Sequence, residues 1–149
     1  MTAAGVLTSI PPGLVLLAAA LLLPFLSRRA GHALGLATTL AILGWVVVVP
    51  AGVHVPAQFL GFEAVEFAVD EASRLMGIIF ALIAAAAVLY SYSSDAENLQ
   101  TAFALGYAAT SLGAVFAGDW LTLLFFWELM AIASTLLVWH YGGRAVRAG

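Results

Sequence analysis

Glu128 is the residue whose type and position could do chemistry, because it is the only charged side chain in the apolar stretch 120–139. Asp119 lies nine residues earlier, about 13.5 Å along a helix axis. If Asp119 marks one interface of a hydrocarbon core about 30 Å thick, Glu128 lies near the middle. A carboxyl there costs on the order of 3 kcal/mol. We interpret Glu128 as a proton or ion site facing the protein interior; a structural glutamate, hydrogen-bonded between helices, is the alternative.

The helix around Glu128 combines small and bulky neighbours. Ala131 and Thr135 lie at helical spacing from the carboxyl, and their small size allows a partner helix to come close. Bulky apolar groups, Trp127 among them, are expected to surround Glu128; they are residues 125–127. An apolar site favours the protonated form of a carboxyl, and a nearby cation favours the ionised form. A carboxyl under both influences can take up and release a proton.

The composition places this stretch in a helical membrane protein. The 149 residues are 64% hydrophobic and 9% charged, whereas soluble domains carry about 25% charged residues. Only helices and closed barrels satisfy the backbone within a lipid bilayer. The net charge of −3 argues against a nucleic-acid partner, and cysteine is absent. We therefore expect the lipid bilayer as surroundings, no disulfide, no metal and no cofactor.

The fold class predicted from hydropathy is an all-α integral membrane protein with five transmembrane helices in one domain, 1–149. The spans are expected at about 11–26, 31–49, 71–90, 96–117 and 120–140. Alternation places Arg28, Arg29, Arg144 and Arg147 on one side. Cytoplasmic loops are enriched in Lys and Arg. The N-terminus is therefore predicted outside and the C-terminus in the cytoplasm, in a multi-pass protein of the cell membrane.

A short outer hairpin is expected between the second and third helices. Residues 53–60 and 62–69 partly alternate around Gly61, a typical turn residue. Asp70 then supplies an acidic start to the third helix. Arg74, four residues later, is expected to pair with Asp70.

The fourth helix carries two further signals. Ser94 and Glu97 have the spacing of a capping box at its start. Residues 106, 110, 113 and 117 are all small and fall on one face, which predicts close approach of another helix.

The fifth helix resembles that of a known family. The residues that carry the resemblance are Asp119-Trp120-Leu121, Phe126-Trp127-Glu128-Leu129-Met130, Ala133-Ser134 and Leu136-Leu137-Val138. They resemble the antiporter-like proton-translocating subunits of respiratory complex I, Mrp-type sodium/proton antiporters and related membrane hydrogenases. The resemblance runs from about Asp70 to Trp139. It implies that Glu128 is a proton-channel glutamate, that Asp70 matches an aspartate with a structural role, and that the hairpin contacts the next subunit.

The resemblance also implies missing parts. The family places a relay lysine on a seventh helix, whereas this chain has no lysine and five predicted spans. We expect a truncated or split member, whose partners are other membrane subunits, including a chain that supplies the later helices and that lysine.

The function expected is that of the N-terminal, proton-conducting portion of a multisubunit cation/proton antiporter, similar to an antiporter-like subunit of the Mrp type. Glu128 would transfer protons, with Na⁺ as a candidate second ion, and Asp70, Asp119, Trp127 and Thr135 would support it. One alternative is a non-redox, proton-pumping subunit of a complex I-type NADH:quinone oxidoreductase or a membrane hydrogenase. The other is a non-transporting scaffold or assembly subunit in which Glu128 is structural.

Overall fold

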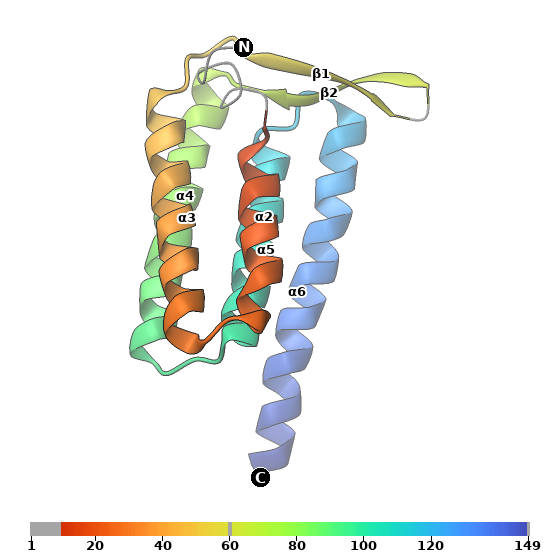
Figure 1. Ribbon diagram of the computed structural model, residues 1–149. Coiled ribbons are helices and arrows are strands. Elements are labelled where there is room, and N and C mark those ends of the chain that lie inside the picture. The colour runs from red at the N-terminus through yellow and green to blue at the C-terminus, as the bar shows by residue number, and fades with distance from the viewer. Residues whose placement is uncertain (1–9, 60, 149) are drawn as a thin grey trace.

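The computed structural model describes residues 10–59 and 61–148; residues 1–9, Leu60 and Gly149 lie outside this range. The described chain is mostly helical, with five α-helices, a short 3₁₀ helix and two strands (Figure 1). In chain order these are α2 (Pro12–Leu22), η1 (Leu23–Phe25), α3 (Arg28–Val48), β1 (His54–Phe59), β2 (Phe62–Ala68), α4 (Glu71–Ser93), α5 (Asn98–Val115) and α6 (Trp120–Ala148).

Three helices are long and apolar enough to cross a membrane, which agrees with a helical membrane protein. They are Arg28–Val48, Glu71–Ser93 and Trp120–His140. The first predicted span corresponds to a shorter apolar helix, Pro12–Phe25, because Pro11 extends the backbone before α2 and the chain ends its helical path at Leu26. The fourth corresponds to α5, with 18 residues.

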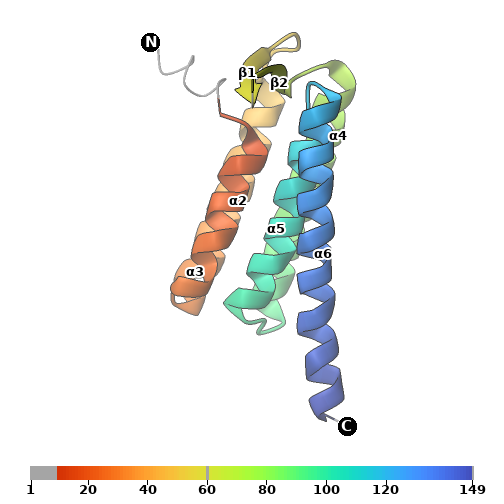
Figure 2. The same cartoon turned by 90° about the vertical axis from the view of Figure 1, so that its right-hand side faces the viewer.

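Helix α5 is the centre of the bundle. It packs against α2, α4 and α6, whereas α3 packs chiefly against α4 (Figures 1 and 2). Its buried leucines Leu105 and Leu112 belong to one continuous apolar core that also contains Leu16 of α2, Val46 of α3 and Val88 of α4. Interlocking side chains of this kind hold membrane helices together, because lipid offers no hydrophobic driving force between them.

The predicted hairpin is confirmed. Strands β1 and β2 are antiparallel, with Phe59 opposite Phe62 and His54 opposite Ala68. Gly61 has a φ of +85°, a backbone conformation that glycine adopts without a Cβ clash. The ring of Phe67 is fully buried and lies 5.5 Å from those of Trp45 and Phe116, which fixes β2 to the end of the bundle.

The hairpin is also bonded to the turn between α5 and α6. The Ala68 N–H donates to the Phe116 carbonyl at 2.9 Å, and the Gly118 N–H donates to the Val65 carbonyl at 3.0 Å. The start of α6 is therefore held by main-chain hydrogen bonds to β2.

At the other end of the bundle, the connection between α2 and α3 is bonded to the connection between α4 and α5 (Figure 1). Arg28 forms a 2.7 Å ion pair with Asp95 and donates to the Tyr92 carbonyl at 2.8 Å. Asn98 donates to the carbonyls of Leu23 and Leu26 at 3.0 and 2.7 Å.

Two local predictions are wrong. Helix α5 begins at Asn98 with Glu97 as its N-cap and no side-chain cap, because Ser94 belongs to the end of α4, where its hydroxyl donates back to the Ser91 carbonyl. Arg74 pairs with Glu71 at 3.0 Å rather than with Asp70. The Asp70 carboxylate instead accepts a hydrogen bond from the Ser73 N–H.

Candidate functional site

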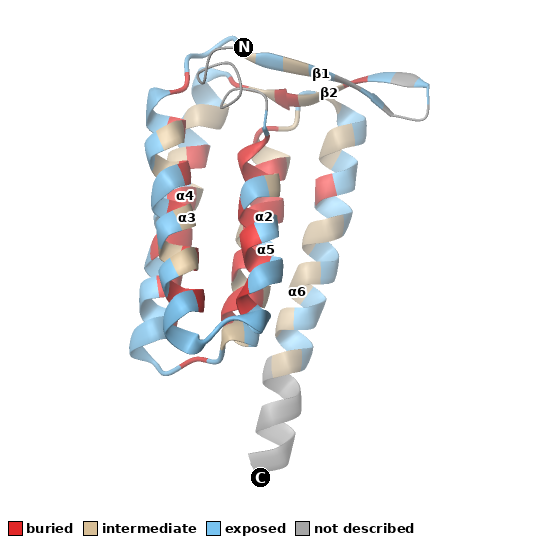
Figure 3. Cartoon of the chain, in the orientation of Figure 1, coloured by how far each residue is buried: buried red, intermediate tan, exposed pale blue. Residues whose placement is uncertain are grey.

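Helix α6 contacts the rest of the bundle along one face only. Phe126, 2% exposed, is its one buried side chain among residues 120–140 (Figure 3). One helical turn further on, the Ser111 hydroxyl of α5, which donates to the Tyr107 carbonyl at 2.8 Å, has its oxygen 3.3 Å from the Met130 sulfur. The His140 ring lies 5.7 Å from that of Phe103, also on α5. These contacts define the face of α6 that lies on α5.

Glu128 faces away from the other four helices. It lies two residues after Phe126, which is about 200° around the helix. Its side chain is exposed and has no hydrogen bond or ion pair within the part of the chain that the structure describes. The prediction that Glu128 faces the interior is therefore wrong for this chain's own helices. The physical reason is that Phe126 occupies the position against α5.

The residues expected to support Glu128 lie on both sides of α6. Trp127 is 58% exposed, and Phe125 is exposed as well. Phe126 does not surround the carboxyl, which corrects that prediction. Ala131 and Thr135 are exposed next to Glu128, so the predicted small face exists but carries no helix of this chain. The Thr135 hydroxyl donates to the Ala131 carbonyl at 2.8 Å, which leaves its oxygen lone pairs available.

Asp119 caps the start of α6. One carboxylate oxygen accepts from the Thr122 N–H at 2.8 Å, and the other accepts from the Val65 N–H of β2. The bond from Thr122, followed by that from Val65, holds the pKa of Asp119 below its usual value, although burial opposes this. Asp119 thus fixes α6 to the hairpin and is separated from Glu128 by about 13.5 Å of helical rise.

Asp70 has a capping role at the start of α4. Its carboxylate accepts from the Ser73 N–H at 2.6 Å, and the Ser73 hydroxyl accepts from the Asp70 N–H at 2.8 Å. These bonds, that from the Ser73 N–H first, lower the pKa of Asp70. The arrangement is a capping box, which satisfies two free N–H groups of the helix start.

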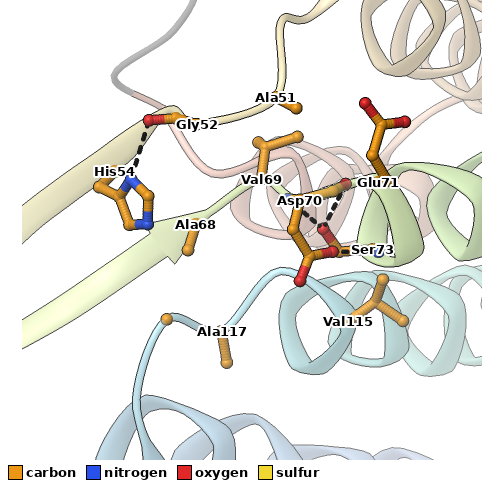
Figure 4. A pocket seen from close by; sticks show the side chains of 11 residues that line it. Ala51, Gly52, His54, Ala68, Val69, Asp70, Glu71, Ser73, Val115 and Ala117 are labelled. Carbon is orange, nitrogen blue, oxygen red and sulfur yellow. Dashed lines mark hydrogen bonds between the residues drawn. The ribbon is translucent and has the colours of Figure 1, made fainter.

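Asp70 also lines an open hollow of ≈ 470 Å³ beneath the hairpin (Figure 4). His54 lies across it from Asp70, and its Nδ1 is 2.8 Å from the Gly52 carbonyl oxygen. Glu128 is not one of the lining residues. The structure therefore brings Asp70 and the α5–α6 turn to one end of the bundle and leaves Glu128 further along α6. Within the described residues, no three His, Asp or Glu side chains gather where they could hold a metal ion.

No protein-family model, curated protein or solved structure matches this chain. The assignment of the site therefore depends on the chemistry and surroundings of Glu128 itself.

Sequence reasoning missed the residues that orient α6. The small-residue face of α5 predicts close helix approach at Gly113, but it does not identify Phe126 as the partner. The contact between Ser111 and Met130 was also missed. The spacing of Phe126, Met130, Ala133 and Leu137, at steps of four, three and four, is the signal that could have identified this face.

Proposed function

We propose that the protein is the N-terminal part of an antiporter-like, proton-conducting subunit of the Mrp type, with Glu128 as its mid-membrane proton carrier. The observation that carries this proposal is a single carboxyl midway along an apolar helix, on a face that the bundle leaves uncovered. An intramembrane carboxyl that no structural bond retains is a functional-site hypothesis by default. The resemblance of residues 119–138 to the family supports the same assignment.

The partner proposed for the Glu128 face is a chain that supplies further helices and a cationic relay residue. Ala131 and Thr135 flank Glu128 with little bulk, so a helix can approach the carboxyl closely. The proposal that this cation comes from further helices is supported by the absence of lysine from the sequence and by the positions of Arg28, Arg29 and Arg74 at helix ends. An approaching cation favours the carboxylate and releases the proton, and its withdrawal favours reprotonation.

The topology proposed has five spans in the cell membrane, with the hairpin outside and the turn containing Arg28 in the cytoplasm. Arg28 and Arg29 lie at the end of the bundle opposite the hairpin (Figure 1). Because cytoplasmic loops are enriched in basic residues, this supports placing that end in the cytoplasm. The side chains of Arg144 and Arg147 lie outside the described part of the structure.

Labelling from each side of the membrane tests this topology. The chain has no native cysteine, so Ser94→Cys and Gln58→Cys each introduce one thiol, both at exposed positions. We expect an impermeant maleimide to label Ser94→Cys only from the cytoplasm and Gln58→Cys only from outside. Labelling of both from the same side excludes the topology.

Two alternatives share parts of this proposal. A proton-pumping subunit of a complex I-type enzyme or of a membrane hydrogenase would use the same Phe-Trp-Glu-Leu-Met segment and differ in the partner that drives it. A scaffold subunit would use Glu128 as a structural hydrogen-bond partner of another chain.

Proton flux through the assembled complex decides between transport and scaffold. Glu128→Gln keeps hydrogen bonding but cannot exchange a proton at working pH. We expect assembly to be retained and flux to fall on the order of 100-fold, the usual contribution of a proton-transferring group. Glu128→Asp should retain partial flux. Glu63→Gln, the same change at an exposed hairpin position, is the control and should leave flux unchanged. Near-normal flux for Glu128→Gln would establish the scaffold alternative.

A further inference from the structure

Phe126 and Gly113 meet where α6 crosses α5. A Cβ atom added to Gly113 would lie 2.6 Å from the Phe126 Cγ and closer still to two other ring carbons. Side-chain Cβ atoms essentially never approach another heavy atom within 3.0 Å. The ring therefore occupies the space that any other residue at position 113 would need.

Helix α5 has little space to move away from this ring, because α2 lies against the same glycine. A Cβ at Gly13 would lie 2.7 Å from both the Gly113 nitrogen and the Ala109 carbonyl oxygen. The backbones of α2 and α5 are thus already as close as glycine permits. Phe126 packs against a helix that is supported from behind.

The other glycine of the small-residue face has no such role. A Cβ at Gly106 meets no atom within 4 Å. Gly106 lies seven residues before Gly113 on the same helix and is of the same residue type. The two glycines therefore form a matched pair in which only one is in contact with α6.

We propose that Gly113 and Phe126 form a positioning pair that sets the rotation of α6 about its own axis and so directs Glu128 away from the chain's own helices. The contact between Ser111 and Met130, one turn further on, lies on the same face and supports the same rotation. Rotation matters because each residue advances about 100° around a helix. A turn of α6 by half a revolution would place Glu128 against α5. The role of this rotation in proton transfer rests on the proposed function. The rotation itself is independent of that function.

A spin label on the Glu128 face measures the rotation directly. Ala131→Cys, labelled with a nitroxide in the otherwise cysteine-free full chain in lipid bilayers, reports accessibility to dissolved oxygen. We expect high accessibility in the unsubstituted background and a loss of accessibility with Gly113→Ala, because the new methyl group forces Phe126 and α6 to turn. Gly106→Ala is the control and should leave the label unchanged.

The double substitution tests the pairing itself. Phe126→Ala removes the ring atoms that a methyl group at position 113 would meet. We expect Phe126→Ala alone to give more than one label environment, because α6 loses its fixed contact. We expect Gly113→Ala with Phe126→Ala to be closer to the unsubstituted protein than either single variant. If Gly113→Ala prevents folding, recovery of folding by Phe126→Ala gives the same evidence for the pair.

Two results would overturn the proposal: unchanged accessibility with Gly113→Ala, or Phe126→Ala that leaves the label in its single original environment. Flux is the second readout. A misplacement of about 1 Å can cost on the order of 100-fold in rate, so we expect Gly113→Ala to lose most flux and the double variant to recover it. Should Glu128→Gln retain flux while the label still shows rescue, the proposed function fails and the positioning pair stands.

Discussion

Helices α5 and α6 are neighbours of similar apolar character, yet they relate to the bundle in opposite ways. Nine of the 18 residues of α5 are buried, and three of these, Thr101, Thr110 and Ser111, carry hydroxyl groups. Of residues 120–140 of α6, Phe126 alone is buried. Helix α5 is therefore packed by other helices of this chain, whereas most of the surface of α6 is exposed.

The two helices also differ in how their polar side chains are hydrogen-bonded. The Thr110 hydroxyl donates to the Tyr107 carbonyl at 2.9 Å, and Ser111 donates to the same carbonyl at 2.8 Å. Such bonds to the preceding helical turn satisfy a buried hydroxyl locally. Glu128 has no bond of this kind within the described chain. The hydroxyl groups of both helices are therefore satisfied by their own helix, and Glu128 is the polar side chain of α6 to which the described chain gives no partner.

The largest predicted difference between the helices is in the cost of removing a leucine side chain. Leu112 of α5 is fully buried and Leu124 of α6 is 57% exposed. We expect Leu112→Ala to lower the free energy of unfolding of the isolated chain by about 2–5 kcal/mol, because a packed cavity results. Leu124→Ala should change it by less than about 0.5 kcal/mol. Reversible unfolding in mixed detergent micelles measures both; equal losses would show that α6 is packed as tightly as α5.

A smaller effect is expected where α6 is attached to the hairpin. Asp119→Ala removes the cap of α6 and the acceptor for the Val65 N–H, and should cost about 1 kcal/mol. Hydrogen exchange of the Val65 amide should become faster. Asp119→Asn keeps one oxygen for capping, so its stability should lie between those of the unsubstituted chain and Asp119→Ala. An unchanged Val65 amide in Asp119→Ala would show that α6 and the hairpin are held by other contacts.

The smallest expected effect is a loss of this attachment in acid. The pKa of Asp119 is lower in the folded protein than its usual value, chiefly because of the Thr122 N–H. A carboxyl of this kind contributes stability above its unfolded pKa of about 3.9 and loses it as the pH falls through the lower folded value. We therefore expect the stability advantage of the unsubstituted chain over Asp119→Ala to shrink below about pH 4. An advantage that grows in acid would contradict this assignment.

The elements of the fold were predictable because their signals are local. Gly61 between two alternating segments indicated the hairpin, and runs of apolar residues indicated the helices. The capping box predicted at Ser94 and Glu97 was wrong because Ser94 ends the preceding helix α4, whereas Glu97 itself is the N-cap of α5. Tertiary contacts at Arg28 and Asn98 then fix this turn.

The orientation of Glu128 was not predicted from the sequence. Phe125, Phe126 and Trp127 are equally suited to face lipid or protein, and only the longer spacing of Phe126, Met130, Ala133 and Leu137 marks the face of α6 that packs on α5. The choice is made by Gly113 on another helix, which leaves space for one ring. The bond between Val65 and Asp119 links residues 54 positions apart and has no local signature. The roles of Glu128, Trp127 and Thr135 in proton transfer stay predictions.

The shortness of α2 has a consequence for the lipid around the protein. Helix α2 and η1 together comprise 14 residues, about 21 Å at helical rise, against a hydrocarbon thickness of about 30 Å. Leu21, Leu22 and Phe25 are exposed near their end. A span shorter than the bilayer is accommodated by local thinning, at fractions of a kcal/mol per Å. In the proposed five-span topology, the α2 side of the molecule should therefore draw the two leaflets together and favour short-chain lipids.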